Sequence, residues 1–250
     1  MDLNETTEEV LYRHPWELSR TQCIIQVLSR YIDQLGERSK CASYINVGAG
    51  DLYFDQALLE KYPQNQVYAV DTAYKDMDSE DARIHKHHYL EEVDVDAVDY
   101  AVMMDSLEYM EDDAAYVRSV ARKIRKGGFF FLTLPAYPFL FSDHDKNVNN
   151  LRRYSRKSFA ELLQKVPELE KIEDHRFYTS LFMVRLTQKL LHLPIDPEHK
   201  VTAYWQYPRN HFFTFVPAAC LTLDFKCNRT LSKAGIRIPG LSMLVVCRRV

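Results

Sequence analysis

Three short polar features each follow a predicted strand in the first half of the chain. They are Gly48-Ala49-Gly50 after residues 44–47, Asp71 after residues 66–70, and Asp105 after residues 99–104. Ligands of an open parallel sheet bind beyond the carboxyl ends of its strands, so these features would meet at one edge. Glycine lets the backbone pass close to a ligand, and a carboxylate can accept hydrogen bonds from both hydroxyls of a ribose. The pattern therefore predicts a site for a nucleoside-bearing cofactor.

A glycine turn alone does not identify the cofactor, because a purely structural strand–helix turn needs the same residues. An aspartate that follows about 20 residues later, at the end of the next strand, favours cofactor binding. Tyr53 occupies the position of the third glycine in the dinucleotide fingerprint, where a bulky side chain obstructs a pyrophosphate. S-adenosylmethionine (SAM) has no pyrophosphate, so Tyr53 argues against NAD and leaves SAM open.

The surrounding segments alternate between strand and helix patterns, with no hairpin signal between them. A helix is predicted from Trp16 to Leu35, stopped near Gly36. Further strands are predicted at 84–88, 129–134 and 244–247, and helical segments at 54–62, 114–124, 159–166, 180–193 and 211–234. Gly127-Gly128 is predicted to cap the helix at 114–124, and Ser158 with Glu161 to form a capping box. The alternation predicts an α/β fold in which a parallel sheet has helices on both faces.

The composition is that of an ordinary globular protein. The chain has 250 residues and a formal net charge of −3, and it lacks the extended basic face that binds nucleic acid. Its five cysteines are widely spaced without a C-x-x-C pair, which favours reduced thiols. The acidic start does not resemble a signal peptide, and no apolar run reaches the roughly 20 residues of a membrane span. We therefore expect a cytoplasmic protein with no nucleic-acid partner and no integral membrane segment.

Longer motifs resemble those of class I SAM-dependent methyltransferases. INVGAGD resembles the first glycine motif of that family, VYAVDTAY its second motif, and VMMDSLEYMEDD its fourth-strand motif. RHPWELSR near the start, LPAYPFLFSDHDKNVNNLRRYSRKSF in the middle and LSMLVVCRR at the end resemble one largely uncharacterised bacterial branch. The resemblance covers nearly the whole chain. It implies a Rossmann-like, seven-stranded, mostly parallel sheet with an antiparallel last strand.

The resemblance also implies which residues bind the cofactor. SAM is the expected cofactor, and Asp71 matches the acid that binds its ribose. The residues expected to contact SAM are Asn46, Gly48, Ala49, Gly50, Asp71, Thr72, His88, Met104, Asp105 and Ser106.

Three positions depart from the family pattern. Asn46 stands where the family usually has an acid, so it keeps hydrogen-bonding capacity without charge. Leu52 replaces a common third glycine, and Asn150 stands where this branch often has a histidine. We expect cofactor binding to tolerate the first two, whereas the third puts in doubt any role of that histidine.

The loop after residues 129–134 carries the candidates for acceptor chemistry. Methyl transfer requires the nucleophile to lie in line with the methyl group, and a hydroxyl or thiol acceptor also needs a base. The expected catalytic residues are Tyr137, His144 and Asp145, and His144 is the best base by its ordinary pKa. Arg153 and Tyr154 are expected to bind substrate. The structural alternatives are a histidine that ties down the loop and an Asp145–Arg153 charge pair that pins it.

Residues 180–240 are interpreted as a helical insertion or cap within a single methyltransferase domain spanning residues 1–250. The aromatic residues of this segment suit an apolar or lipid-linked acceptor, a subdomain core or a homodimer interface. The first helix, with Trp16 and Arg20, either covers the cofactor or packs on the sheet edge. The cluster of His85, His87 and His88 has no carboxylate or cysteine at ligand spacing, so no metal site is expected.

The sequence thus predicts SAM-dependent methylation of a small-molecule acceptor at an oxygen or nitrogen nucleophile. A catalytically inactive SAM-binding partner or regulatory protein is the main alternative, kept open by Asn46 and Asn150. A nicotinamide-dependent oxidoreductase is a third hypothesis, which Tyr53 disfavours. The fold does not specify the acceptor, because one fold hosts many functions.

Overall fold

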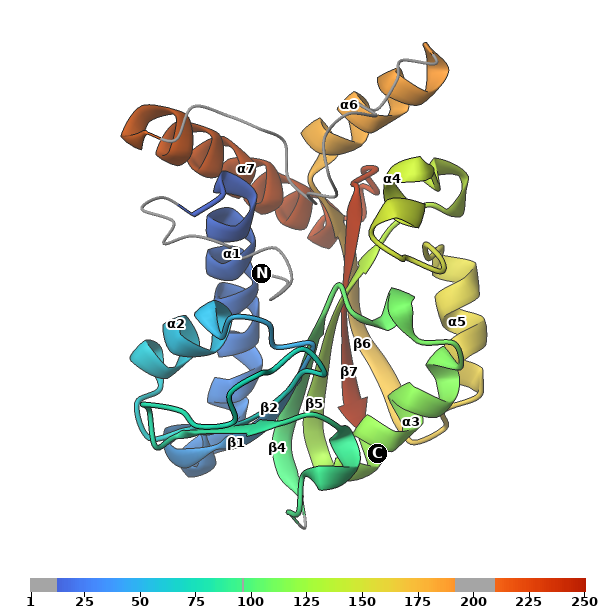
Figure 1. Ribbon diagram of the computed structural model, residues 1–250. Helices are drawn as coiled ribbons and strands as arrows, with labels where there is room; N and C mark the ends of the chain where they lie inside the picture. Colours follow the sequence, from blue (N-terminus) through green and yellow to red (C-terminus); the bar gives the residue numbers. More distant parts are fainter. Residues whose placement is uncertain (1–12, 96, 192–209) are drawn as a thin grey trace.

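A computed structural model describes residues 13–95, 97–191 and 210–250, in which a seven-stranded sheet forms the centre (Figure 1). The strands are β1 Ser43–Val47, β2 Gln66–Val70, β3 Ile84–His87, β4 Val98–Met104, β5 Ile124–Pro135, β6 Leu169–Phe177 and β7 Ser242–Arg249. They lie in the order β3-β2-β1-β4-β5-β7-β6. The pairs from β3 to β5 are parallel, and β7 is antiparallel to both of its neighbours, β5 and β6. The predicted Rossmann-like sheet with an antiparallel last strand is confirmed.

Helices cover both faces of the sheet, as predicted (Figure 1). The α-helices are α1 Pro15–Ile32, α2 Tyr53–Lys61, α3 Asp113–Lys123, α4 Asp143–Asn147, α5 Arg156–Gln164, α6 Thr179–Leu190 and α7 His211–Lys233. Helices α1, α2 and α7 share one apolar core with the sheet, and α3 and α5 share the other. Because side chains alternate along a strand, neighbouring residues of β1 serve different cores: Tyr44 the first and Ile45 the second.

Two predicted helix signals lie elsewhere in the structure. Gly127-Gly128 does not cap α3, because that helix ends at Lys123 and the glycines lie inside the irregular start of β5. A Cβ on Gly128 would lie 2.4 Å from the carbonyl oxygen of Asp99, so glycine is required there by the close approach of β4. The capping box at the start of α5 is formed by Ser155 and Ser158, one turn before the predicted pair.

The strand β6 was not assigned a range from the sequence. Its residues, LEKIEDHRF, are largely charged and are mostly only part-buried. The strand lies at one edge of the sheet, where one side needs no partner strand and charged side chains remain in contact with water. Its apolar alternation is therefore too weak to be read from the sequence.

Helices α6 and α7 lie between β6 and β7 in the chain, and α7 packs beside α1 (Figure 1). Asp224 of α7 accepts hydrogen bonds from the backbone N–H groups of Thr179 and Ser180, which fixes the start of α6. Several large apolar side chains of the two helices are exposed: Met183, Val184, Leu190, Phe212, Phe213, Phe215, Val216 and Leu223. None of the described helices is long and apolar enough to cross a membrane. Three of the aromatic residues in segment 180–240 lie outside the described residues: Tyr204, Trp205 and Tyr207.

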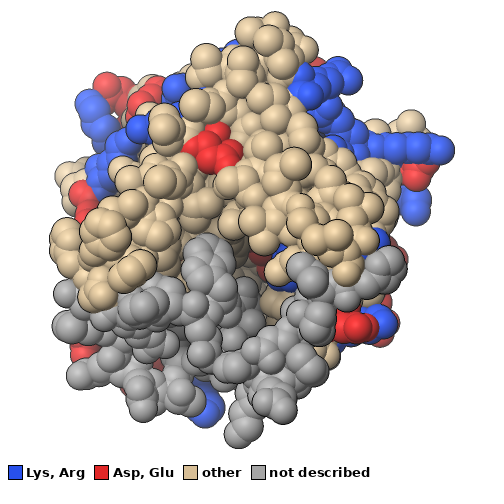
Figure 2. Space-filling model, turned by 90° about the horizontal axis from the view of Figure 1, so that it is seen from above, with Lys and Arg blue, Asp and Glu red and all other residues tan. Residues whose placement is uncertain are grey.

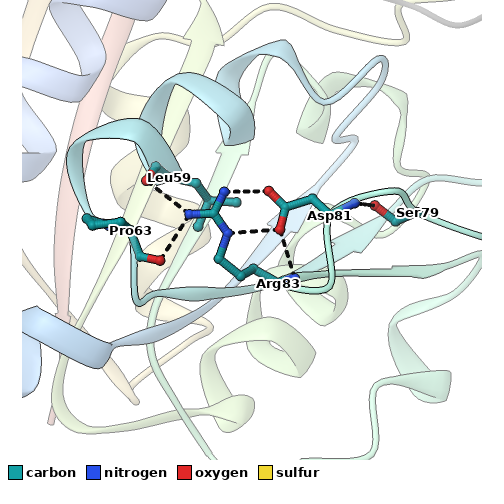
Figure 3. A network of polar contacts seen from close by, with 5 residues as sticks. All are labelled: Leu59, Pro63, Ser79, Asp81 and Arg83. Atoms are coloured by element: carbon teal, nitrogen blue, oxygen red, sulfur yellow. Dashed lines mark hydrogen bonds and ion pairs between the residues drawn. The ribbon is translucent and has the colours of Figure 1, made fainter.

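A polar network holds the loop between β2 and β3 against the end of α2 (Figure 3). The guanidinium of Arg83 donates to both carboxylate oxygens of Asp81 and to the carbonyl oxygens of Leu59 and Pro63. The bidentate pair with Asp81 fixes the guanidinium, and the bonds to Leu59 and Pro63 join the start of β3 to the end of α2. The network lies at the amino end of the sheet, where the backbone N–H of Val67 in β2 also donates to the carbonyl oxygen of Arg83.

Candidate functional site at the carboxyl ends of the strands

The turn after β1 has a backbone that only glycine adopts without strain. Gly48 and Gly50 have φ values of 69° and 59°. The N–H groups of Gly48 and Ala49 both donate to the carbonyl oxygen of Val70, which draws the turn against the end of β2. A Cβ on Gly48 would lie 2.5 Å from Oγ of Ser106, so glycine is also needed for space. Leu52, at the family's third glycine position, still takes a positive φ of 65° as the N-cap of α2.

Asp71 connects the glycine turn to the end of β2. Its Oδ2 accepts a hydrogen bond of 2.9 Å from the N–H of Gly50, and its Oδ1 accepts one of 2.9 Å from Ala73. Each carboxylate oxygen has two acceptor positions, so both oxygens retain one. Asp71 is only half-buried, and these positions can receive the two hydroxyls of a ribose. The adjacent Thr72 is exposed.

Asn46 points to a buried carboxylate that the sequence analysis did not single out. Its Nδ2 donates to both oxygens of Asp55 at 3.0 and 2.9 Å, and the Tyr44 hydroxyl donates to Asp55 at 3.0 Å. Burial raises the pKa of Asp55 to about 7. A signal for this burial is present in the sequence. Asp55 lies one turn before Leu58 and Leu59, so it shares the apolar face of α2 with them.

The side-chain carbonyl oxygen of Asn46 is placed to accept a hydrogen bond from a ligand. Its oxygen is buried and accepts no hydrogen bond in the described part of the chain, although Asp55 holds the opposite amide nitrogen in place. A buried acceptor without a donor is costly, and the amine of a bound amino acid supplies such a donor. Together with the open glycine turn and the remaining acceptor positions of Asp71, this orphaned oxygen fits SAM.

The end of β4 forms the other side of the glycine turn. Met104 is half-buried, and the Ser106 hydroxyl lies 3.0 Å from the carbonyl oxygens of both Val47 and Met104. Asp105 has a positive φ of 47° and forms an ion pair of 2.5 Å with Arg20 of α1. The carboxylate of Asp105 is therefore engaged by a helix rather than left open for a ligand.

Helix α1 is tied to both sides of the predicted cofactor site. Arg13, just before the helix, forms an ion pair of 2.6 Å with Asp51 in the glycine turn and lies 3.9 Å from the ring centre of Tyr53. One to two turns later, Arg20 reaches Asp105 and lies over the ring of Trp16 at 4.0 Å. Tyr53, which argued against a dinucleotide, is thus part of the contact between the turn and the N-terminal end of α1.

His88 follows β3 and turns toward the loop after β2. Its Nε2 lies 2.9 Å from the carbonyl oxygen of Tyr74, and its backbone N–H donates to Glu92. These contacts place His88 beside the segment that follows Asp71. Among the described residues, no group of three or more His, Cys, Asp or Glu side chains is placed to hold a metal ion.

Asp145 is the centre of the loop after β5. It is fully buried and accepts hydrogen bonds from Ser142, Asn150 and Arg153. Burial alone would raise its pKa, but the charge and hydrogen bonds of Arg153 outweigh burial and hold the pKa of Asp145 below its usual value. These bonds occupy both carboxylate oxygens, so the geometry favours the structural alternative for this pair. Asn150 donates one of these hydrogen bonds and so helps to hold the same loop.

Tyr154 is part of the core and has no surface for a substrate. It is only 2 % exposed, and its hydroxyl donates to Asp113 at 3.0 Å. Its backbone pairs with Ala136, which closes the base of the loop. The expectation that Tyr154 binds substrate is corrected accordingly, because the side chain points into the core beneath α3 and α5.

Tyr137 and His144 remain on the open side of this loop. Tyr137 has a φ of 63°, and its ring centre lies 4.9 Å from that of Phe182 on α6 and 3.8 Å from the guanidinium of Arg176. Burial, reinforced by the charge of Arg185, lowers the pKa of His144 to about 4. The imidazole is therefore neutral at pH 7 but is a weaker base than its ordinary pKa suggested. Arg176 and Arg185 were not singled out from the sequence.

Viewed from above, onto the carboxyl ends of the parallel strands, the surface is hollowed near its centre (Figure 2). Basic and acidic atoms are visible inside the hollow. The glycine turn, Asp71 and the β5–α5 loop all belong to this end of the sheet, which is where the sequence analysis expected a ligand.

Comparison with known proteins identifies the family. Residues 20–217 match the sequence model of a family described as "Methyltransferase domain". The chain belongs to this methyltransferase family. The predicted resemblance to class I SAM-dependent methyltransferases is thereby confirmed, and SAM is the cofactor of this methyltransferase. No curated protein matches the chain.

Solved structures show the same fold at low sequence identity. Geranyl diphosphate methyltransferase in complex with SAM aligns with a TM-score of 0.56 and 10% identity, covering 90% of this chain and 85% of that one. A protein named as a sarcosine dimethylglycine methyltransferase of Galdieria sulphuraria aligns at 0.53 and 11%, covering 90% and 84%. A methyltransferase bound to the Trm112 activator of Haloferax volcanii aligns at 0.52 and 14%, covering 84% and 83%.

Proposed function

We propose that this enzyme transfers the methyl group of SAM to an oxygen or nitrogen atom of a small-molecule acceptor. The acceptor would lie beside the loop after β5, between Tyr137 and the start of α6. The observation that carries the cofactor half of this proposal is the hydrogen bond from the Gly50 N–H to Asp71, beside the unpartnered carbonyl oxygen of Asn46.

The proposed cofactor contacts divide among the ends of four strands, β1 to β4. Asn46, Gly48, Ala49 and Gly50 after β1 would hold the amino-acid part of SAM, and Asp71 with Thr72 after β2 the ribose. His88 would lie near the base, and Met104, Asp105 and Ser106 would border the site from β4. SAM itself supplies a methyl group already activated by the sulfonium, so the protein's main task is to hold the acceptor in line.

In this proposal, aromatic and apolar groups would line the acceptor side. Phe182 of α6 contacts Tyr137, and α6 and α7 expose many further apolar side chains. These features support an acceptor with an apolar part, including a lipid-linked one. With a pKa of about 4, His144 is a weak base. It would accept a hydrogen bond from the acceptor more readily than it would remove a proton from it. The protein would therefore rely on positioning the acceptor more than on base catalysis.

Thermal unfolding with SAM, S-adenosylhomocysteine or NADH tests the cofactor half. A ligand that binds only the folded state stabilises it, by about 2.7 kcal/mol at one hundred times its dissociation constant. We expect both sulfur ligands to raise the melting temperature and NADH to leave it unchanged. A rise with NADH alone would replace the methyltransferase proposal with an oxidoreductase.

A pair of aspartate variants makes this test specific. Asp71 and Asp76 each accept a hydrogen bond from the N–H two residues later, but only Asp71 also holds Gly50. Asp71→Ala should abolish most of the SAM-dependent rise, whereas Asp76→Ala should preserve it. Formation of S-adenosylhomocysteine with an added acceptor then distinguishes an active enzyme from a SAM-binding protein without turnover.

A further inference from the structure

Three arginines lie at the loop that carries Tyr137: Arg153 in the loop itself, Arg176 on β6 and Arg185 on α6. Arg176, near the end of β6, lies over the Tyr137 ring at 3.8 Å, and Arg153 donates to the carbonyl oxygen of the preceding residue, Ala136, at 3.4 Å. Arg185 lies one turn after Phe182 on α6, and the ring of Phe182 contacts Tyr137. We call Arg153, Arg176 and Arg185 the arginine cluster.

Within the described residues, Arg153 of the arginine cluster is paired with a carboxylate, whereas Arg176 and Arg185 are not. Asp145 is paired with Arg153 at 2.8 Å. Within residues 13–95, 97–191 and 210–250, neither Arg176 nor Arg185 forms an ion pair, and the Nε of Arg176 is buried without a hydrogen-bond acceptor. Burial and the nearby charge of Arg153 lower the pKa of Arg185, which indicates two cations held close together.

Other acidic groups near this end of the sheet are already engaged. Asp105 is paired with Arg20, Asp174 with Arg156 and Asp143 with Lys146. Glu108 is buried, and burial together with the nearby charge of Asp105 raises its pKa well above the usual value. In the described part of the chain, Arg176 and Arg185 thus form no ion pair, and the Asp145 carboxylate near Arg185 is already paired with Arg153.

We propose that Arg176 and Arg185 of the arginine cluster bind a phosphate group carried by the methyl acceptor. A phosphate monoester carries a charge of about −1.5 to −2 at pH 7, which matches the two uncompensated arginines better than a single carboxylate does. The guanidinium fork donates two parallel hydrogen bonds to phosphate oxygens. Arg176 is held by the Tyr137 ring, and Arg185 by a helix that is anchored through Asp224. This inference rests on the proposed function and narrows its class of acceptor.

Titration calorimetry on the full chain with inorganic phosphate, and with acetate at equal ionic strength, tests the proposal. We expect phosphate to bind at one site and acetate to bind much more weakly. Removing one charged donor, in Arg176→Gln or in Arg185→Gln, should weaken phosphate binding at least about tenfold. Arg122→Gln is the matched control, because Arg122 is exposed on α3 and pairs only with Glu168. Unchanged phosphate affinity in both cluster variants, or acetate binding as tightly as phosphate, would overturn the proposal.

Two further measurements separate the possible causes. The SAM-dependent rise in melting temperature, recorded on the same samples, shows whether each variant is folded and whether the cofactor site works. Arginine-dependent phosphate binding without a SAM effect would refute the proposed function alone, whereas a SAM effect without phosphate binding would refute the arginine cluster alone. Sedimentation with phosphatidic acid vesicles, compared with binding of phenyl phosphate, distinguishes a lipid phosphate from a soluble one. Arg185→Gln should weaken whichever interaction is real.

Discussion

In the described part of the chain, the buried carboxyl of Asp55 beside the glycine turn forms no ion pair. Its three hydrogen bonds come from Asn46 and Tyr44, both neutral, so burial dominates and the pKa is about 7. The family's usual acid at position 46 is thus replaced by an amide that faces an acid from α2. The two residues together retain one carboxylate beside the turn, although on the helix instead of the strand.

The perturbed pKa of Asp55 predicts a pH dependence of stability. The unfolded chain releases this proton near pH 3.9, whereas the folded protein keeps it up to about pH 7. The contribution of this group to stability is therefore complete below about pH 4 and declines as the pH rises through about 7. Asp55→Asn should remove a decline of at most about 1.4 kcal/mol per pH unit. Urea unfolding at about pH 5 and about pH 8 measures it.

The exposed Asp76→Asn serves as the control for this measurement, since its carboxylate lies on the surface. The free energy of unfolding is compared between the two pH values. If it changes by the same amount in wild type and in Asp55→Asn, Asp55 ionises normally in the folded protein.

Gly48 offers a second test at the residue scale. Gly48→Ala introduces a positive-φ alanine, at a cost of about 1–2 kcal/mol, and a Cβ that meets Ser106. Gly36→Ala is matched in φ, which is 64°, but its Cβ meets nothing within 4 Å. We expect Gly48→Ala to be clearly the less stable variant in urea and to bind SAM more weakly. Equal stabilities would mean that Ser106 moves aside at no cost.

At the scale of elements, α1 connects the glycine turn to the end of β4. Arg13 pairs with Asp51 and Arg20 with Asp105, so the start of this helix spans both sides of the proposed cofactor site. The sequence analysis could not decide between a helix that covers the cofactor and one that packs on the sheet. In the structure, Cys23, Ile24, Val27 and Leu28 of α1 are buried in the core, and the ion pairs of Arg13 and Arg20 hold the start of the helix at the strand ends. We propose that this start also covers the cofactor.

Arg20→Gln tests the contribution of this helix. Removal of one partner from the part-buried Arg20–Asp105 pair should cost about 1–3 kcal/mol and loosen the first turns of α1. Hydrogen exchange of the α1 amides should become faster, and SAM affinity should fall. Arg30→Gln, in the exposed last turn of the same helix, should change neither. Normal protection and normal SAM affinity in Arg20→Gln would show that the ion pair does not hold the helix in place.

For the whole molecule, the two apolar cores share one sheet. Because every strand from β1 to β7 is paired within that sheet, we propose that the described chain unfolds as a single domain. Scanning calorimetry should give one transition whose calorimetric and van't Hoff enthalpies agree, and SAM should shift it as a unit. Separate unfolding of α6 and α7 would instead appear as a second transition that SAM does not move.

The amino-acid sequence by itself determined the strand–helix alternation, the glycine turn and the positions of Asp71 and Asp105 at strand ends. These features depend on the spacing of apolar residues and on the backbone freedom of single glycines. Both can be read from residues that are close together in the sequence. The longer motifs added the family, the cofactor and the antiparallel last strand.

Only the tertiary structure decided which polar groups are in contact, because ion pairs join residues far apart in the chain. The sequence suggested chemical roles for Asp145 and Tyr154. In the structure Asp145 is buried and paired with Arg153, and Tyr154 lies in the core. Asp55, Arg176 and Arg185 belong to no local motif, but the fold buries the carboxyl of Asp55 beside Asn46, places Arg176 on the ring of Tyr137 and brings Arg185 near Arg153. Charge balance is a property of such spatial neighbours, and no local pattern in the sequence expresses it.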